Sequence, residues 1–293
     1  MPRGRRLDLL ASFRPHPLDQ PVPHPTTLSK LVRRAGSEVI EQLNTALLTK
    51  LAADKLLRGH KLRVDTTVVE ADIDYPTDAD LLEQAVRKVG GLVRRIKAHG
   101  AASRTAFRNR GRAAGRRMRQ LAHALRRRGG QAMAEVDRLT AQVATLARRT
   151  LGEVEPVRRN ARRALGRRPQ DGRLGWLVGE LDKTIGHTGR LLWQTDQRLA
   201  GNRVIPDRLV SLADPDARPI RKGKPRAPTE FGYTLLLAED ERGFVADHLL
   251  QQGNPADAPQ LVPAVTRVAQ VTGRVAATVV GDRGSAPPPT TAR

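Results

Sequence analysis

A long stretch with helical periodicity, residues 77–200, separates the first predicted strand of this chain from all the others. The first strand covers residues 62–69, LRVDTTVV, a short segment rich in β-branched residues. Pro76 ends the extended segment, because the residue before a proline avoids the helical region, and Thr77 then begins a helix. Apolar residues at helical spacing predict helices over 77–96, 132–147 and 174–192. The sequence therefore predicts a sheet that is interrupted by a helical insertion.

The apolar pattern changes again after residue 201, where four more strands and one helix are predicted. The predicted strands cover residues 208–212, 233–238, 244–250 and 276–281, and a helix over 258–271 precedes the last of them. Upstream of the first strand, apolar residues recur at every fourth position from 37 to 57 and predict another helix, which Gly59 ends. Together these segments predict a mixed α/β fold.

Two segments of the insertion carry many Arg residues. Residues 99–130 are dominated by Arg and Gly, have little apolar periodicity, and are interpreted as a basic loop or a weak helix. Residues 155–172, EPVRRNARRALGRRPQDG, are interpreted as the basic connection between two long helices. This arrangement predicts a helical hairpin arm.

Positive charge is concentrated in the same insertion. The chain has a formal net charge of +22, and residues 87–168 hold 24 Arg or Lys but only 4 Asp or Glu, a balance of +20. A concentrated positive field points to a polyanion, most simply nucleic acid. Arg outnumbers Lys by 43 to 9, which suits phosphate binding, although a GC-rich genome would also favour Arg. Codon bias explains much less of the clustering.

Composition excludes several classes of protein. The chain has no Cys, so disulfide frameworks and thiolate metal sites are excluded. It has no run of 18 apolar residues that would predict a membrane span. The apolar part of the basic N-terminus, MPRGRRLDLLASF, is too short and too broken for a signal peptide. The expected location is therefore the cytoplasm, with no membrane partner.

Two aspartates occupy positions that favour metal binding. Asp65 stands in the middle of the first apolar strand, and Asp282 stands where the last predicted strand ends. A buried carboxylate needs a partner, and the two carboxylates can meet if their strands are neighbours in one sheet. Mg²⁺ takes oxygen ligands, and two such ions can assist phosphoryl transfer. The pair therefore predicts a Mg²⁺ site.

Each acid in this region also has a simpler interpretation. Asp282, Arg283 and Gly284 form a common turn sequence, and Asp65 could form an ion pair with one of the many arginines. The other acids beside the first strand are interpreted as solvent-facing or capping residues: Asp72, Asp74, Asp78 and Asp80.

Four segments, in order, resemble bacterial insertion-sequence transposases of the DDE type, which have an RNase H-like fold. HPTTLSKLVRR is similar to their N-terminal DNA-binding portion, and RVDTTVVEADIDYPTDADLL is similar to their first catalytic block. LVSLADPDARPIRKGKPRAPTEFGYTLLLAED resembles their middle strands, while GNPADAPQL and VVGDRG resemble the following helix and the second catalytic block. The resemblance covers about residues 24–284.

The resemblance implies a fold and a chemistry. The implied fold is an incomplete RNase H-like sheet with a long, Arg-rich helical insertion after the first strand and a helical N-terminal segment. Such enzymes hold two Mg²⁺ ions with three carboxylates, cut DNA at transposon ends and join it to target DNA. Asp65 matches the first catalytic and metal-binding acid, and Asp282 matches the second. The implied contacts to the DNA backbone are the arginines of the insertion together with Arg221, Lys222, Lys224 and Arg283.

The resemblance also implies a division of the chain. The expected parts are a disordered basic leader (1–25), a helical DNA-binding segment (26–60), the first core strand (61–76), the helical basic insertion (77–200), the remaining core (201–284) and a disordered tail outside the family pattern (285–293). Eleven residues follow Asp282, none of them acidic, and three consecutive prolines forbid a helix there. We therefore expect a C-terminally truncated enzyme that lacks the third acid and is inactive alone.

Several functional hypotheses stay open at this point. The chain is a truncated DDE transposase, a non-catalytic DNA-binding inhibitor of transposition, or a general nucleic-acid-binding protein. Frame-shifting during expression of the gene is an alternative explanation of the same C-terminal sequence. The basic insertion is either an arm that forms a homo-oligomer or an arm that holds DNA.

Overall fold

The computed structural model describes residues 24–126, 130–202, 204–221 and 229–281. The chain forms two compact units, each built from several stretches. The first unit contains Met1–Arg63, Ala238–Asp247 and Val262–Val280. The second contains Val64–Leu237, His248–Leu261 and Gly281–Arg293. Four strands of the sheet have residues in both units.

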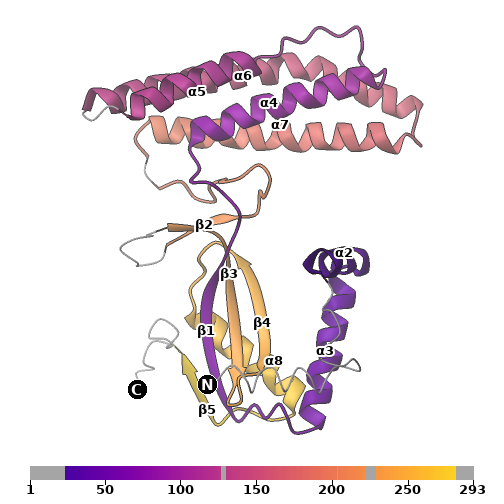
Figure 1. The fold of residues 1–293 in the computed structure, drawn as a ribbon, viewed down its shortest axis with the longest axis vertical. Helices are drawn as coiled ribbons and strands as arrows, with labels where there is room; N and C mark the ends of the chain where they lie inside the picture. The colour runs from indigo at the N-terminus through magenta and orange to yellow at the C-terminus, as the bar shows by residue number, and fades with distance from the viewer. Residues whose placement is uncertain (1–23, 127–129, 203, 222–228, 282–293) are drawn as a thin grey trace, which may run out of the picture. The chain divides into compact units, whose positions relative to one another are not determined.

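The sheet has five strands in the order β2-β3-β1-β5, with β4 paired to β3 (Figure 1). Strand β2 is antiparallel to β3, with Arg218 opposite Gly232 and Arg221 opposite Thr229. Alternate residues of β3 are buried from Gly232 to Asp240, the two-residue period expected of a strand. The strands are β1 (Lys61–Glu70), β2 (Arg218–Arg221), β3 (Thr229–Asp240), β4 (Val245–Gln252) and β5 (Thr278–Gly281). With seven described helices, this sheet confirms the prediction of a mixed α/β fold.

The predicted strand over residues 208–212 is wrong, because this segment is a buried loop. Leu209 is fully buried, which explains its apolar pattern. Its backbone groups bond to a side chain instead of another strand: the N–H donates to Gln194 Oε1 at 3.0 Å, and the carbonyl accepts from Gln194 Nε2 at 3.1 Å. The apolar residues of this segment therefore reflect the burial of a loop. The side-chain amide of Gln194 makes the hydrogen bonds that a neighbouring strand would otherwise make.

The insertion of the second unit is a bundle of four helices: α4 (Asp78–Ala98), α5 (Gly111–Leu125), α6 (Gly130–Arg167) and α7 (Gly172–Leu199). Helix α4 begins where the sequence predicted, because the Thr77 hydroxyl accepts from the Asp80 N–H at 3.1 Å. Asp171 caps α7 in the same way, accepting from the Leu174 N–H at 2.9 Å. These caps fix the starts of the two helices.

Of the two interpretations of residues 99–130, the helix holds for Gly111–Leu125, which form α5. The prediction of a basic connection over 155–172 is corrected, because α6 continues through Pro156 to Arg167 and most of this segment is helical. A proline inside a helix costs about 3 kcal/mol. Here the neighbouring residues Val154 and Val157 are fully buried in the bundle, and their packing offsets that cost.

Two large apolar clusters, and a smaller third one, form the core of the bundle. Helix α4 contributes to both large clusters, with Leu82 and Val86 in one cluster and Val89 and Val93 in the other. Helices α6 and α7 also contribute to both clusters. Because the same helices line both clusters, the bundle has its own core.

In the first unit, helices α2 (Pro25–Ala35) and α3 (Ser37–Ala53) precede the sheet, and α8 (Ala258–Thr272) lies between β4 and β5 in the chain. Helix α3 ends at Ala53 and not at residue 57, and of its predicted apolar positions only Leu51 is buried, together with Leu48. The prediction of a helix over 258–271 is confirmed by α8, with Ala264 and Val268 buried. Among the described helices, none combines the length and the apolar character that a membrane span requires.

Candidate nucleic-acid interface

Helix α5 presents a row of basic side chains on one face. The residues follow one another at spacings of four, three, four and three, so they lie on the same side of the helix, over about 21 Å of its length. All of them are exposed, and α5 contains no Asp or Glu. This α5 basic row consists of Arg112, Arg116, Arg119, His123 and Arg126, the last at the C-cap.

The opposite face of α5 holds the row in the exposed position. Ala114, Leu121 and Ala124 are buried, and Met118 packs against the same clusters. A rotation of the helix that buried the arginines would expose these apolar residues. Core packing therefore fixes which way the basic row faces.

The charges of the α5 basic row are not compensated within the described part of the chain, because no described Asp or Glu forms an ion pair with them. Other arginines of the bundle do have acidic partners: Arg138 lies 2.6 Å from Glu135, Arg162 lies 2.8 Å from Asp182, and Arg148 pairs with Asp196. The charges of these three arginines are thus neutralised by acids, whereas those of the α5 basic row are not.

Shallow hollows border the row on two sides. One hollow is lined by Arg87, Arg94, Asn109 and Arg112, together with Gly91 and Gly111. The other lies between α5 and α6 and includes Arg116, Arg117, Gln142 and Thr145. These linings add guanidinium and amide donors beside the row, which are groups that bind phosphate oxygens.

The start of α5 is attached to α6 by one acid. Glu153 accepts from Arg110 Nη1 at 2.7 Å and from the Arg108 N–H at 3.1 Å, and Arg110 Nη2 forms the second half of a two-point pair. The hydrogen bonds from Arg110 lower the pKa of Glu153 from its ordinary 4.5 to about 2. The hydrogen bond to Glu153 in turn raises the pKa of Arg110. The pair therefore stays ionised and holds the loop before α5 against α6.

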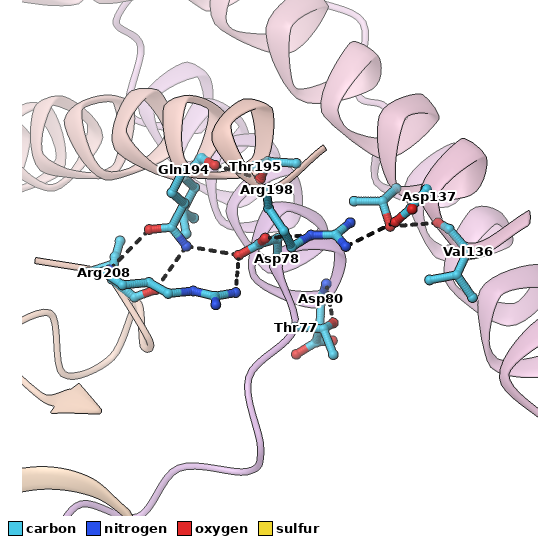
Figure 2. Close-up of polar contacts among 12 residues, drawn as sticks. Thr77, Asp78, Asp80, Val136, Asp137, Gln194, Thr195, Arg198 and Arg208 are labelled. Carbon is cyan, nitrogen blue, oxygen red and sulfur yellow. Dashed lines mark hydrogen bonds and ion pairs between the residues drawn. The ribbon is translucent and has the colours of Figure 1, made fainter. Parts of the chain in front are cut away.

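A buried carboxylate, Asp78, joins α4, α7 and the loop at residue 208 (Figure 2). It is 2% exposed, and its Oδ1 accepts from Gln194 at 3.0 Å and from Arg208 at 2.8 Å. Arg198 Nε lies 3.1 Å from the other oxygen, and Arg198 also donates to Asp137 at 3.0 Å.

The interpretation of Asp78 as solvent-facing or capping is therefore wrong, whereas Asp72 and Asp74 are exposed as expected. The partners of Asp78 lie more than a hundred positions away in the sequence, so local spacing gave no signal for them. Two cations and an amide surround this carboxylate: its Oδ1 accepts two hydrogen bonds, whereas its Oδ2 lies beside Arg198 as an ion pair without a hydrogen bond.

The structure describes two of the predicted site residues. Asp65 lies in β1, is half-buried, and accepts from the Thr66 N–H at 2.8 Å. Arg221 is the exposed last residue of β2. The other predicted site residues lie outside the described residues: Asp282, Lys222, Lys224 and Arg283. Among the residues that are described, no group of three or more His, Cys, Asp or Glu side chains could hold a metal ion.

The strand that carries Asp65 and the strand that precedes Asp282 are neighbours in the sheet, as the metal hypothesis requires. The Ala277 N–H donates to the His60 carbonyl at 2.9 Å, and β1 and β5 run in the same direction in Figure 1. Gly281 is the last residue of β5. Asp282 is the next residue of the sequence.

Comparison of the chain with protein-family models, with curated proteins and with solved structures gave no match. Sequence reasoning recognised the basic segment 99–130 but missed the α5 basic row. The signal was present, because Arg112, Arg116 and Arg119 already have helical spacing. Apolar periodicity alone does not reveal it.

Proposed function

We propose that this chain is a DNA-binding protein related to DDE transposases, and that the α5 basic row is its main contact with the DNA backbone. The observation that carries the proposal is the row itself: five exposed basic side chains on one helix face, without an acidic partner among the described residues. Arg138, Arg148 and Arg162 are basic too, but their charges are already neutralised by acids.

The chemistry of the row suits a phosphate backbone. Successive side chains of the row are about 5 Å apart along the helix axis, and each strand of DNA carries a phosphate about every 3.4 Å of its axis. A helix lying beside the backbone can therefore approach several phosphates at once. Such contacts provide affinity and strong salt dependence but no choice of sequence.

The proposal extends to the sheet and to its two acids. We propose an RNase H-like sheet in which Asp65 and Asp282 hold Mg²⁺, supported by the pairing of β1 with β5 and by the chain order of strand, insertion, hairpin, helix and strand. Asp65 fits one ligand position. It is half-buried on a strand, and its carboxylate offers the oxygen ligands that a hard cation prefers. Bound Mg²⁺ would supply the electrostatic part of phosphoryl transfer.

The DNA-binding proposal is tested by fluorescence anisotropy with a labelled duplex at several salt concentrations. The variant R112Q/R116Q/R119Q removes three uncompensated charges, and the matched control R138Q/R148Q/R162Q removes three charges that have acidic partners. We expect the first variant to bind at least about tenfold more weakly and to lower the salt slope by about 3, since each phosphate contact contributes about 0.9. Equal losses in both variants would contradict a role for the row.

The catalytic part needs a separate experiment. The substitution Asp65→Asn is expected to leave duplex binding unchanged and to abolish any Mg²⁺-dependent nicking of DNA that flanks the gene. Wild-type protein that binds this DNA without nicking it supports the non-catalytic inhibitor instead. Equal affinity for flanking and random duplexes at moderate salt favours the general nucleic-acid-binding protein.

A further inference from the structure

A hollow of about 570 Å³ lies between the middle of α4 and the start of α5. This volume is within the roughly 300–1,000 Å³ that is typical of small-ligand sites. Most such sites are apolar, but the described lining of this one has no aromatic or aliphatic side chain, so it does not suit a nucleobase. We call it the α4–α5 hollow, and it is lined by Arg87, Gly91, Arg94, Asn109, Gly111 and Arg112.

Positive charge exceeds negative charge around the α4–α5 hollow. Arg87 Nε lies 2.5 Å from an oxygen of Glu83, so this guanidinium has an acidic partner. Arg94 and Arg112 form no ion pair with any Asp or Glu in the described part of the chain. Three guanidinium groups and one carboxylate therefore leave two positive charges uncompensated. Guanidinium groups bind phosphate oxygens through paired N–H donors, so this lining favours an anionic ligand.

Asn109 forms a fixed wall of the α4–α5 hollow. Its Oδ1 accepts from the Gly111 N–H at 2.9 Å. The same oxygen lies 2.8 Å from the position that a Cβ would take at Gly90, so this side chain fits against α4 only because residue 90 is glycine. The next residue, Arg110, is held to α6 by its pair with Glu153. The wall is therefore attached to both helices before a ligand binds, which lowers the entropic cost of binding.

Gly91 keeps the space between two of the arginines open. Arg87, Gly91 and Arg94 follow one another at spacings of four and three, so they lie on the same side of α4. Apart from its chain neighbours and its own helix backbone, no atom lies within 4 Å of the ideal Cβ position of Gly91. Packing within the chain therefore leaves this space free for a ligand.

We propose that the α4–α5 hollow binds neighbouring phosphate groups, supplied either by a nucleic acid or by a free polyphosphate. Arg87 and Arg94 are about 10 Å apart along the axis of α4, so the site extends over more than one phosphate. The hollow meets the α5 basic row at Arg112, which belongs to both. The inference rests on the DNA-binding proposal only for the source of the phosphates, because a free polyphosphate presents the same oxygens.

The first test is isothermal titration calorimetry of the full chain with sodium tripolyphosphate at constant ionic strength. The substitution Gly91→Glu places a carboxylate in the open space, where it repels an anion, and we expect at least about tenfold weaker binding. Helical circular dichroism should be unchanged, because Glu favours a helix more than Gly does. The matched control Gly186→Glu adds the same charge at an open position of α7 and should change the affinity less than about twofold.

The second test titrates the same variants with a labelled DNA duplex and identifies the source of the phosphates. If a nucleic acid fills the hollow, Gly91→Glu weakens duplex binding more than Gly186→Glu does, and tripolyphosphate displaces the duplex from wild-type protein. If Gly91→Glu weakens only tripolyphosphate binding, the ligand of the hollow is a free polyphosphate. Equal affinities of the two variants for both ligands would overturn the inference.

These outcomes are separate from those of the DNA-binding proposal, because Gly91 lies outside the α5 basic row. Wild-type protein that binds tripolyphosphate in a Gly91→Glu-sensitive manner but binds no duplex would overturn the DNA-binding proposal and keep this inference. Duplex binding that depends on the row, together with equal behaviour of Gly91→Glu and Gly186→Glu, would do the reverse.

Discussion

At the scale of single residues, Gly232 controls how closely β1 and β3 approach each other. Its φ is +154°, and a Cβ built there would lie 2.1 Å from the Val69 carbonyl oxygen and 2.9 Å from the Ala71 nitrogen. Both obstacles are backbone atoms, so no rotamer change can relieve the clash. We expect Gly232→Ala to lower the free energy of unfolding by about 3 kcal/mol or more, measured by urea denaturation.

Gly186 is the matched control for this substitution. It lies within α7, and no atom outside its own helix backbone is within 4 Å of its ideal Cβ position. Gly186→Ala should stabilise the protein by up to about 1 kcal/mol, because alanine favours the helix. If both substitutions had the same small effect, the contact between β1 and β3 would be looser than the structure indicates.

Asp78 gives a second prediction at this scale. Removing one partner of a buried ion pair leaves uncompensated charge, which costs about 3–5 kcal/mol. Arg198 keeps Asp137, and the Arg198 and Arg208 side chains are about a third exposed, so we expect Asp78→Ala to cost less than this, about 1–3 kcal/mol in urea denaturation. Asp74→Ala, on the exposed segment nearby, should change stability by less than about 0.5 kcal/mol. Equal effects of the two substitutions would mean that the hydrogen bonds and ion pairs around Asp78 contribute little to folding stability.

At the scale of elements, α5 is attached through a pair whose charge depends on pH. The folded-state pKa of Glu153, about 2, lies below its ordinary 4.5. Its contribution is therefore fully present above about pH 4.5, and it is lost as the pH falls towards 2. We expect wild-type stability to decrease over this window and Glu153→Gln to decrease less steeply, as measured by thermal unfolding at each pH. Parallel curves for both proteins would show that the pair does not hold the loop in solution.

Sequence predicted elements well where local chemistry decides the outcome, and poorly where distant residues decide it. Thr77 and Asp80 are three positions apart, so the start of α4 could be read directly. The loop at Leu209 resembled a strand because burial makes a loop as apolar as a strand, and its partner Gln194 lies on another element. Residues 155–172 were interpreted as a connection because the packing that keeps α6 helical there cannot be seen in its own sequence.

The candidate site was likewise predictable where local sequence decides the outcome and not where distant residues decide it. Strand β1 and its Asp65 were predicted, since β-branched residues around an acid form a local pattern. The uncompensated state of the α5 basic row could not be predicted, because it depends on which arginines find acids in other turns or helices. Residue types along the chain identified a basic region, and only the packed bundle shows that Arg148 and Arg162 have acidic partners while the α5 basic row has none among the described residues.

At the scale of the whole molecule, the concentrated positive charge favours DNA binding but lowers folding stability. Residues 87–168 carry a balance of +20, and they form most of one helical bundle, so like charges repel within a small volume. Added salt screens this repulsion, because the Debye length falls to roughly 8–10 Å at 0.10–0.15 M ionic strength. The same salt weakens contacts with DNA phosphates. Stability and DNA affinity should therefore respond to salt in opposite directions.

We expect the midpoint of thermal unfolding to rise by a few degrees as NaCl increases from low to physiological ionic strength, while the affinity for duplex DNA falls in the same buffers. The variant R112Q/R116Q/R119Q carries less repulsion in the bundle, so its unfolding midpoint at low salt should exceed that of the wild type and should rise less with salt. Differential scanning fluorimetry measures both midpoints. A wild-type midpoint that falls with NaCl would show that salt-sensitive ion pairs, such as Arg148 with Asp196, outweigh the repulsion among the arginines of the bundle.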